Sequence, residues 1–264
     1  MGLIDSHAHL DLSEFNTDRD AVIKRARTEG VVSIVTIGIG LEECRAALQI
    51  AQQWPFVYAA LGIHPHNAGR WSAQVRDFLE HAARQPKVVA LGEIGLDFYR
   101  NRSSKEDQRR CFRDQIGLAK SLKLPVIIHD REAHRETLDI VREEHAGEYG
   151  GVFHCFSGDA ALARKCIDLG FYISIPGTVT FRNASLLHEV VRAVPLEYLL
   201  IETDCPFLTP VPFRGKRNEP AYVRYVAEAI AALKQLPLEE VAYATTKNTK
   251  RLFRLSGDER ITSP

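Results

Sequence analysis

The chain lacks paired cysteines, long uncharged apolar runs and a net charge. Its five cysteines are scattered over 264 residues without a Cys-x-x-Cys motif, which predicts free thiols in a reducing compartment. No apolar run approaches the ~18 residues of a membrane span. The N-terminus has no basic segment followed by an apolar one, so we expect no signal peptide. These absences predict a cytoplasmic protein with no membrane contact.

Charge is balanced, with 34 Lys and Arg against 34 Asp and Glu. A nucleic-acid partner would therefore need a local basic patch, because the chain as a whole presents no positive field. The composition, 45% hydrophobic and 26% charged, is typical of a globular protein with a large core.

Short apolar runs alternate with helical patterns along most of the chain. The expected strands are the opening stretch 4–10 and the runs 31–37, 56–63, 87–93, 125–128, 151–153, 171–175 and 198–201. Short buried strands separated by helices form parallel sheets, and eight such units in about 250 residues predict a (β/α)₈ barrel. We expect one α/β domain over residues 1–255 and a frayed tail over 256–264. The alternative is an open, doubly wound sheet.

The first candidate site is the pair His7 and His9. In an extended strand, residues i and i+2 point to the same side, so both imidazoles project together. Neutral imidazole is a common ligand of divalent transition metals. Taken alone, such a pair is more often two surface histidines at the start of a loop, and further ligands from other strands must decide.

Those further ligands follow from the barrel. Six of the eight expected strands end in a histidine or a carboxylate, and strand ends meet at one mouth of such a barrel. These residues are His7, His9, His64, Glu93, His129, His154 and Asp204. Without His64, whose role as ligand or neighbour stays open, they supply four imidazoles and two carboxylates. Six ligands suit two ions about 3.5–4 Å apart that share a carboxylate.

Other polar residues near these ends have two interpretations each. Asp5 and Asp11 could orient an imidazole or cap a local turn, and Asp97 could do the same or lie free in a loop. His66 is expected in a loop.

Cationic residues also follow the strand ends. Arg214, Lys216 and Arg217 lie in a Pro- and Gly-bounded segment, and Arg131 follows the fifth strand. Gathered at one mouth, they predict a patch that binds an anionic substrate.

Several motifs together resemble the TatD family of metal-dependent deoxyribonucleases, within the amidohydrolase-like hydrolases. The resemblance runs in order from residue 3 to about 254. It rests on Asp5-Ser6-His7-Ala8-His9-Leu10, Gly62-Ile63-His64-Pro65-His66, Gly92-Glu93-Ile94-Gly95-Leu96-Asp97, Pro125-Val126-Ile127-Ile128-His129, Phe153-His154-Cys155-Phe156-Ser157-Gly158, Glu202-Thr203-Asp204-Cys205-Pro206, Arg214-Gly215-Lys216-Arg217-Asn218-Glu219-Pro220 and Asn248-Thr249-Lys250-Arg251-Leu252-Phe253.

The resemblance implies a TIM-like barrel and a 3′→5′ exonuclease that cleaves DNA at single-stranded or frayed 3′ ends. It also implies two divalent ions, which we expect to be zinc, manganese, magnesium or nickel. One ion would be held by His7, His9 and Asp204, the other by His129 and His154, with Glu93 between them. No obligate protein partner is expected.

The residues also predict a mechanism. Two ions would activate water, Asp204 would accept its proton, and His64 would steady a phosphate oxygen. Two alternatives stay open: a metal hydrolase of a small amide, lactone or phosphoester, and a non-catalytic barrel that binds nucleic acid.

Overall fold

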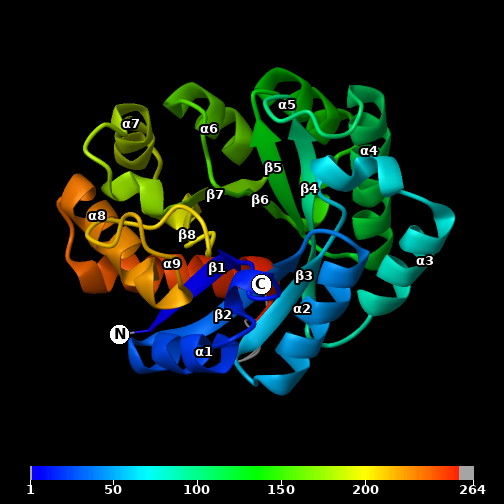
Figure 1. Ribbon diagram of the computed structural model, residues 1–264. Helices are drawn as coiled ribbons and strands as arrows, with labels where there is room; N and C mark the ends of the chain where they lie inside the picture. Colours follow the sequence, from blue (N-terminus) through cyan, green and yellow to red (C-terminus); the bar gives the residue numbers. More distant parts are fainter. Residues whose placement is uncertain (1, 256–264) are drawn as a thin grey trace, which may run out of the picture.

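The computed structural model describes residues 2–255, which form a ring of parallel strands surrounded by helices (Figure 1). The eight strands are β1 (Leu3–Ala8), β2 (Val31–Gly38), β3 (Val57–Leu61), β4 (Val88–Asp97), β5 (Val126–Arg131), β6 (Gly151–Phe153), β7 (Phe171–Ile175) and β8 (Leu199–Ile201). The α-helices of the same residues are α1 (Arg19–Thr28), α2 (Leu41–Gln53), α3 (Ala73–Ala82), α4 (Lys105–Leu122), α5 (His134–Glu143), α6 (Ala160–Asp168), α7 (Ser185–Ala193), α8 (Val223–Lys234) and α9 (Leu238–Phe253). Short 3₁₀ turns lie between them.

The sheet closes on itself. Neighbouring strands pair in parallel in chain order from β1 to β8. Next to β8, the amide of Asp204 donates to the carbonyl of His7 at 2.9 Å, and the amide of His9 donates to the carbonyl of Cys205 at 2.8 Å. This closure confirms the (β/α)₈ barrel and excludes the open sheet, in which the first strand lies inside the sheet.

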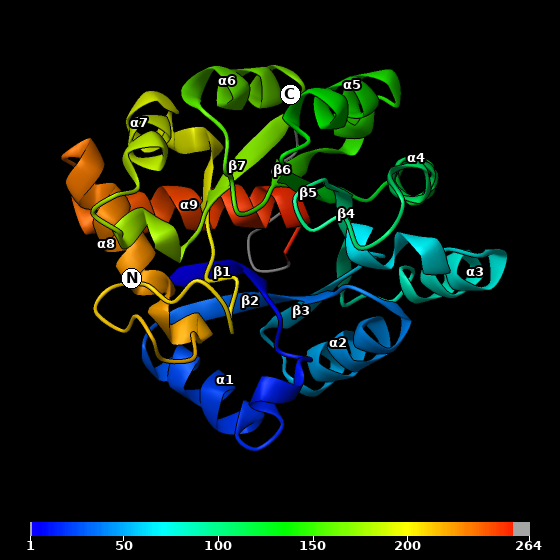
Figure 2. The same ribbon diagram turned by 45° about the horizontal axis from the view of Figure 1, so that its top comes forward.

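Apolar side chains fill the barrel from within and pack its outer surface against the helices. The inner cluster contains Ile4, Ile37 and Ile127, together with Leu252 and Phe253 from the end of α9. Helix α9 therefore closes the end of the barrel where strands begin, while the helices α1 to α8 surround the strands (Figure 2). The opposite end, where strands finish, is left to polar residues.

The expected elements agree with the structure to within a few residues, and β4 is the largest exception. The run 87–93 is predicted to stop at Glu93, but β4 continues to Asp97. Glycines make the longer strand possible: a Cβ on Gly95 would lie 2.0 Å from the carbonyl oxygen of His129 on β5. Glu93 thus projects from within a strand and not from its end.

Three further expectations concern membrane spans, the cysteines and the C-terminal tail. No helix in residues 2–255 has the length and apolar character needed to cross a membrane. The five cysteines are all free. The expected tail, residues 256–264, lies outside the described residues, so the domain boundary at residue 255 stays a prediction.

Candidate metal centre

Strand β1 brings His7 and His9 to the barrel mouth with their Nε2 atoms 3.3 Å apart. The Nδ1 atom of His9 lies 3.1 Å from the carbonyl oxygen of Ile37. A carbonyl only accepts, so Nδ1 carries a proton and Nε2 is the nitrogen that faces the site. His7 Nδ1 is buried and has no hydrogen-bond partner among the described residues. Both Nε2 atoms are thus available to a metal ion.

Asp204 faces this pair from across the barrel seam. Its Oδ1 lies 3.3 Å from Nε2 of His9 and 3.8 Å from Nε2 of His7. Burial opposes ionisation of Asp204, but the hydrogen bond from His9 and the charges of His9 and His7 outweigh it and lower its pKa. We infer that the side chain of Asp204 is ionised. His7, His9 and Asp204 therefore form one group of side chains of the kinds that bind metal ions.

Glu93 joins this set to a second group of histidines. Its Oε1 lies 2.5 Å from Nδ1 of His129 and 2.7 Å from Nε2 of His154. Its Oε2 lies 3.4 Å from Nε2 of His7 and 3.8 Å from Nε2 of His9. Burial raises the pKa of Glu93, but the nearby imidazoles outweigh burial and hold it well below 4.5. An ionised carboxylate therefore separates two groups of imidazoles and presents one oxygen to each.

Two further carboxylates, Asp97 and Glu202, lie beside the second group. The Nε2 atom of His129 lies 3.3 Å from Asp97, which leaves Nδ1 facing Glu93. Nδ1 of His154 lies 3.6 Å from Glu202 and has no hydrogen-bond partner among residues 2–255, while its Nε2 faces Glu93. Asp97 was left open by the sequence, and here it is buried and also contacts His66 at 2.8 Å. Glu202 lies in the same sequence motif as Asp204 but was given no role there; its position two residues before Asp204 was the available signal.

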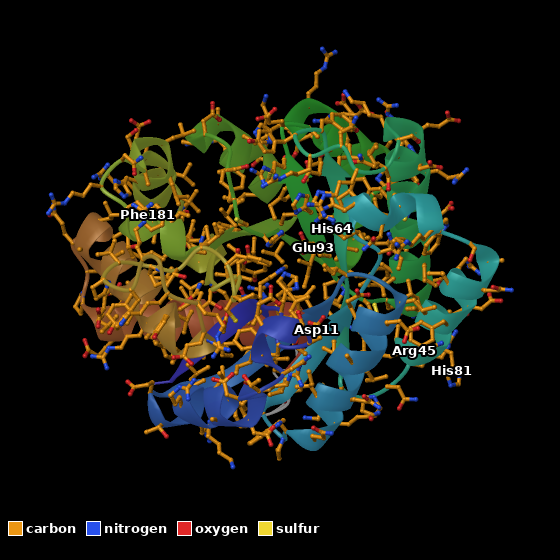
Figure 3. All side chains as sticks on the ribbon, viewed as in Figure 1. Asp11, Arg45, His64, His81, Glu93 and Phe181 are labelled. Atoms are coloured by element: carbon orange, nitrogen blue, oxygen red, sulfur yellow. The ribbon has the colours of Figure 1, made fainter. Side chains whose placement is uncertain are left out.

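His64 differs from His9 and His129 because its proton lies on the nitrogen that faces Glu93. Its Nδ1 accepts a hydrogen bond from the amide of His66 at 3.0 Å, so the proton lies on Nε2, which faces Glu93 at 3.3 Å (Figure 3). Burial lowers the pKa of His64 to about 4, so the ring is neutral. A protonated Nε2 cannot bind a metal ion, and this geometry favours a hydrogen-bond donor at the site.

The donor set fits divalent ions. Buried carboxylates alternate with imidazole nitrogens that face one another at 3.3 Å, both in the His7–His9 pair and in the His129–His154 pair. Buried polar groups need a partner, and divalent cations bind facing imidazole nitrogens of this kind. Among residues 2–255, three groups of such residues have ligand atoms that lie within 4.8 Å of one another inside each group, and two of the groups share His7. These groups are His7, His9 and Asp204; His7, His154 and Glu202; and His64, Glu93 and His129.

Asp5 and Asp11, which flank the His7 and His9 pair in the sequence, have different surroundings. Asp5 accepts hydrogen bonds from the amide and hydroxyl of Thr203 at 2.9 and 2.6 Å, and so ties β1 to the segment after β8. Asp11 has two buried carboxylate oxygens without a hydrogen-bond partner among residues 2–255. Burial raises the pKa of Asp11 to about 6. Neither carboxylate bonds to an imidazole.

The predicted basic residues have different surroundings. The guanidinium of Arg214 lies 4.2 Å from the ring centre of Phe181, and that of Arg131 lies 4.2 Å from that of Tyr99. Arg214 and Lys216 are exposed. Arg217 instead donates two hydrogen bonds to Asp18 on the other side of the seam, at 2.8 and 2.7 Å. Arg214, Lys216 and Arg131 thus remain open to an anionic ligand, and Arg217 is already engaged.

Comparison with known proteins places this site in a family. Residues 4–254 match the family described as TatD related DNase. The chain belongs to the TatD family. It is 48% identical over 254 residues to the uncharacterized metal-dependent hydrolase YabD of Bacillus subtilis. The aligned residues cover 96% of this chain and 100% of that protein. It is a metal-dependent hydrolase, like its TatD relatives.

Two more TatD proteins extend the comparison. The 3′-5′ ssDNA/RNA exonuclease TatD of Salmonella typhimurium is 37% identical over 259 residues, which cover 96% of this chain and 99% of that one. The crystal structure of YJJV, a TatD homolog from Escherichia coli, superposes with a TM-score of 0.90 at 34% identity, over 96% of this chain and 98% of that one. The match therefore spans the barrel and its mouth, and not a fragment of it.

Proposed function

We propose that this hydrolase cleaves the phosphodiester bonds of DNA, removing nucleotides from single-stranded or frayed 3′ ends, with two divalent ions in the centre described above. The observation that carries the proposal is the position of Glu93, with one oxygen toward each group of imidazoles. The name of the Salmonella relative, an exonuclease for single-stranded DNA and RNA, supports the substrate class. The five free thiols support a reducing compartment such as the cytoplasm.

The assignment of ligands follows the family resemblance and the two groups of imidazoles on either side of Glu93. His7, His9 and Asp204 would hold one ion, and His129 and His154 the other, with Glu93 shared between them. When bound, two such ions lower the pKa of a water molecule and neutralise charge that develops at phosphorus. Zinc, manganese and nickel suit the four imidazoles, while magnesium prefers oxygen ligands.

The chain's own residues would then perform two tasks. Asp204 is an ionised carboxylate at the mouth and would accept the proton of the attacking water. His64 is neutral with its proton on Nε2, and would donate that hydrogen to a non-bridging phosphate oxygen. Arg214, Lys216 and Arg131 would contact neighbouring phosphates, because their charges are open to solvent at the same end of the barrel.

The test is a comparison of linear and circular strands. Protein reconstituted with zinc, manganese, nickel or magnesium is incubated with 5′-labelled single-stranded DNA, with the same strand closed into a circle, and with RNA of equal sequence. The proposal expects a ladder of products shortened one nucleotide at a time from the 3′ end, and an intact circle. Cleavage of the circle would exclude the exonuclease. Hydrolysis of small esters without cleavage of any strand would exclude a nucleic-acid substrate.

A further inference from the structure

Two exposed aromatic rings lie at the barrel mouth. Tyr99 is 53% exposed and Phe207 is 48% exposed. Rings of this size are usually buried, so exposed ones beside a polar site often mark a contact with another molecule. Each lies next to a different half of the metal centre, and neither has a role in the mechanism above.

Phe207 lies beside the His7, His9 and Asp204 group. Its amide donates to the carbonyl of Asp204 at 3.0 Å, which fixes the backbone in the turn after β8. Its ring centre is 6.2 Å from that of His9, with the ring planes at 64°. The ring is thus held against the metal centre on one side and open to solvent on the other.

Tyr99 lies beside the second group. It is the second residue after β4, and the amide of its neighbour Phe98 donates to the carbonyl of Arg131 at 3.0 Å. The guanidinium of Arg131 lies 4.2 Å from the Tyr99 ring centre, and Arg131 is two residues beyond His129 on β5. The planar guanidinium of Arg131 and the ring of Tyr99 thus lie together at the edge of the His129 and His154 group.

We propose that Phe207 and the Tyr99–Arg131 pair are two stacking surfaces for unpaired bases, one on each side of the phosphate to be cleaved. The inference rests on the proposed function and identifies the residues that select a single-stranded substrate. Aromatic rings and guanidinium planes bind single strands by stacking on bases, with little dependence on sequence. A base stacked on the protein cannot remain in a duplex, so these surfaces restrict cleavage to single-stranded ends.

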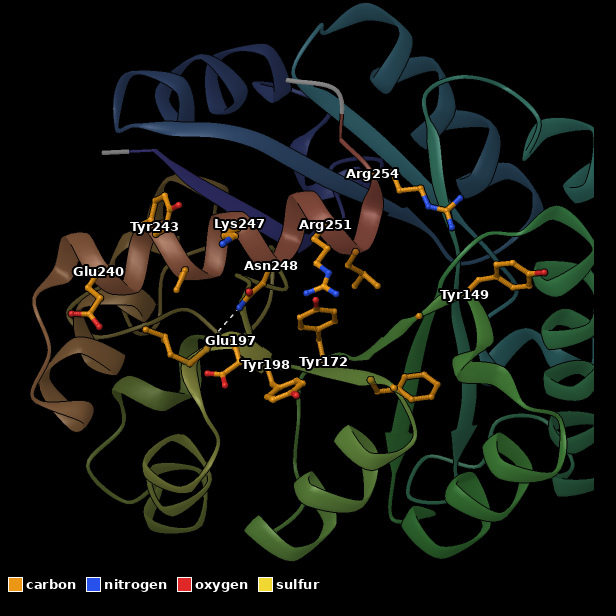
Figure 4. Close-up of a pocket in the computed structure, with 16 residues that line it drawn as sticks. Tyr149, Tyr172, Glu197, Tyr198, Glu240, Tyr243, Lys247, Asn248, Arg251 and Arg254 are labelled. Carbon is orange, nitrogen blue, oxygen red and sulfur yellow. Dashed lines mark hydrogen bonds between the residues drawn. The ribbon is translucent and has the colours of Figure 1, made fainter. Parts of the chain in front are cut away.

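The chain contains a matched control for this idea. Tyr243 on α9 is 69% exposed, and the Lys247 ammonium lies 6.0 Å from its ring centre. The two residues line a cavity of about 810 Å³ formed by segments that precede β6, β7 and β8, at the opposite end of the barrel (Figure 4). Tyr243→Ala removes a tyrosine beside a cation without touching the mouth.

The experiment compares two strands within each variant. One strand is normal, and the other has abasic nucleotides at its two 3′-terminal positions. Stacking on an aromatic ring typically changes affinity by about tenfold or more per base, so the wild type should show a KM at least about tenfold lower for the normal strand. Tyr99→Ala and Phe207→Ala should reduce this preference, while Tyr99→Phe, Phe207→Tyr and Tyr243→Ala should keep it. Because each ratio is measured on one preparation, partial unfolding cancels.

Three outcomes would contradict the inference, each for a different reason. An unchanged preference in both alanine variants would show that the rings do not stack on bases, while the nuclease activity itself would stand. An equal loss in Tyr243→Ala would show that the preference does not depend on the rings at the mouth. A wild type that cleaves neither DNA nor RNA would overturn the proposed function, and this inference with it.

Discussion

Glu93→Gln should remove metal and nuclease activity together. The two oxygens of Glu93 lie 2.5 to 3.8 Å from nitrogens of five imidazoles, so no other carboxylate of the site contacts as many. Gln keeps one carbonyl oxygen, but it loses the negative charge and turns an NH₂ group toward one group of histidines. Removing a residue that only orients a ligand costs about 10–100-fold in metal affinity. For a shared ligand we expect at least about 100-fold for one ion.

The assay is metal analysis after dialysis, with 3′-nucleotide release measured on the same preparation. Glu202→Gln is the comparison, because Glu202 is also buried but contacts a single imidazole, His154, at 3.6 Å. It should lose less metal than Glu93→Gln. Two ions per chain and wild-type turnover in Glu93→Gln would refute the shared-ligand assignment, and equal losses in both variants would indicate a general effect of buried charge.

Four other changes test separate parts of the site. Asp204→Asn should lower nucleotide release at least about 100-fold, with thermal melting and DNA binding nearly unchanged. Neutralising Arg214 and Lys216 should weaken DNA binding and reduce the slope of log K against log salt by about 1.4, as expected for two contacts to a single strand. Arg217→Gln should lower the free energy of unfolding by about 1 kcal/mol through loss of its ion pair, measured in denaturant. Gly95→Ala should lower both stability, by about 2 kcal/mol or more, and metal content, because its Cβ would lie 2.0 Å from a carbonyl oxygen of β5.

The positions of the metal-ligand candidates could be predicted because they depend on a repeated rule. Apolar runs, helical periodicity and Gly stops locate the strands, and parallel strands in a barrel finish at one mouth. Residues as distant as His7, Glu93 and Asp204 therefore come together without any detailed knowledge of packing. Their binding of metal stays a prediction.

The remaining details could not be predicted, because they depend on contacts between distant segments. The tautomer of His64 is set by the amide of His66, and the engagement of Arg217 is set by Asp18, 199 residues away. Asp18 uses its carboxylate there and makes no side-chain cap on α1, which begins at Arg19. Local patterns carry no information on such pairings.

The most direct test of the two-ion account is a metal titration of chelator-treated protein, with bound ions per chain and release of 3′-terminal nucleotides measured at each step. The account predicts little cleavage up to one bound ion per chain and a steep rise in cleavage as the second ion binds. With both manganese and zinc, the rise should occur between one and two bound ions per chain. Full cleavage with one bound ion, or no dependence on added metal, would contradict it.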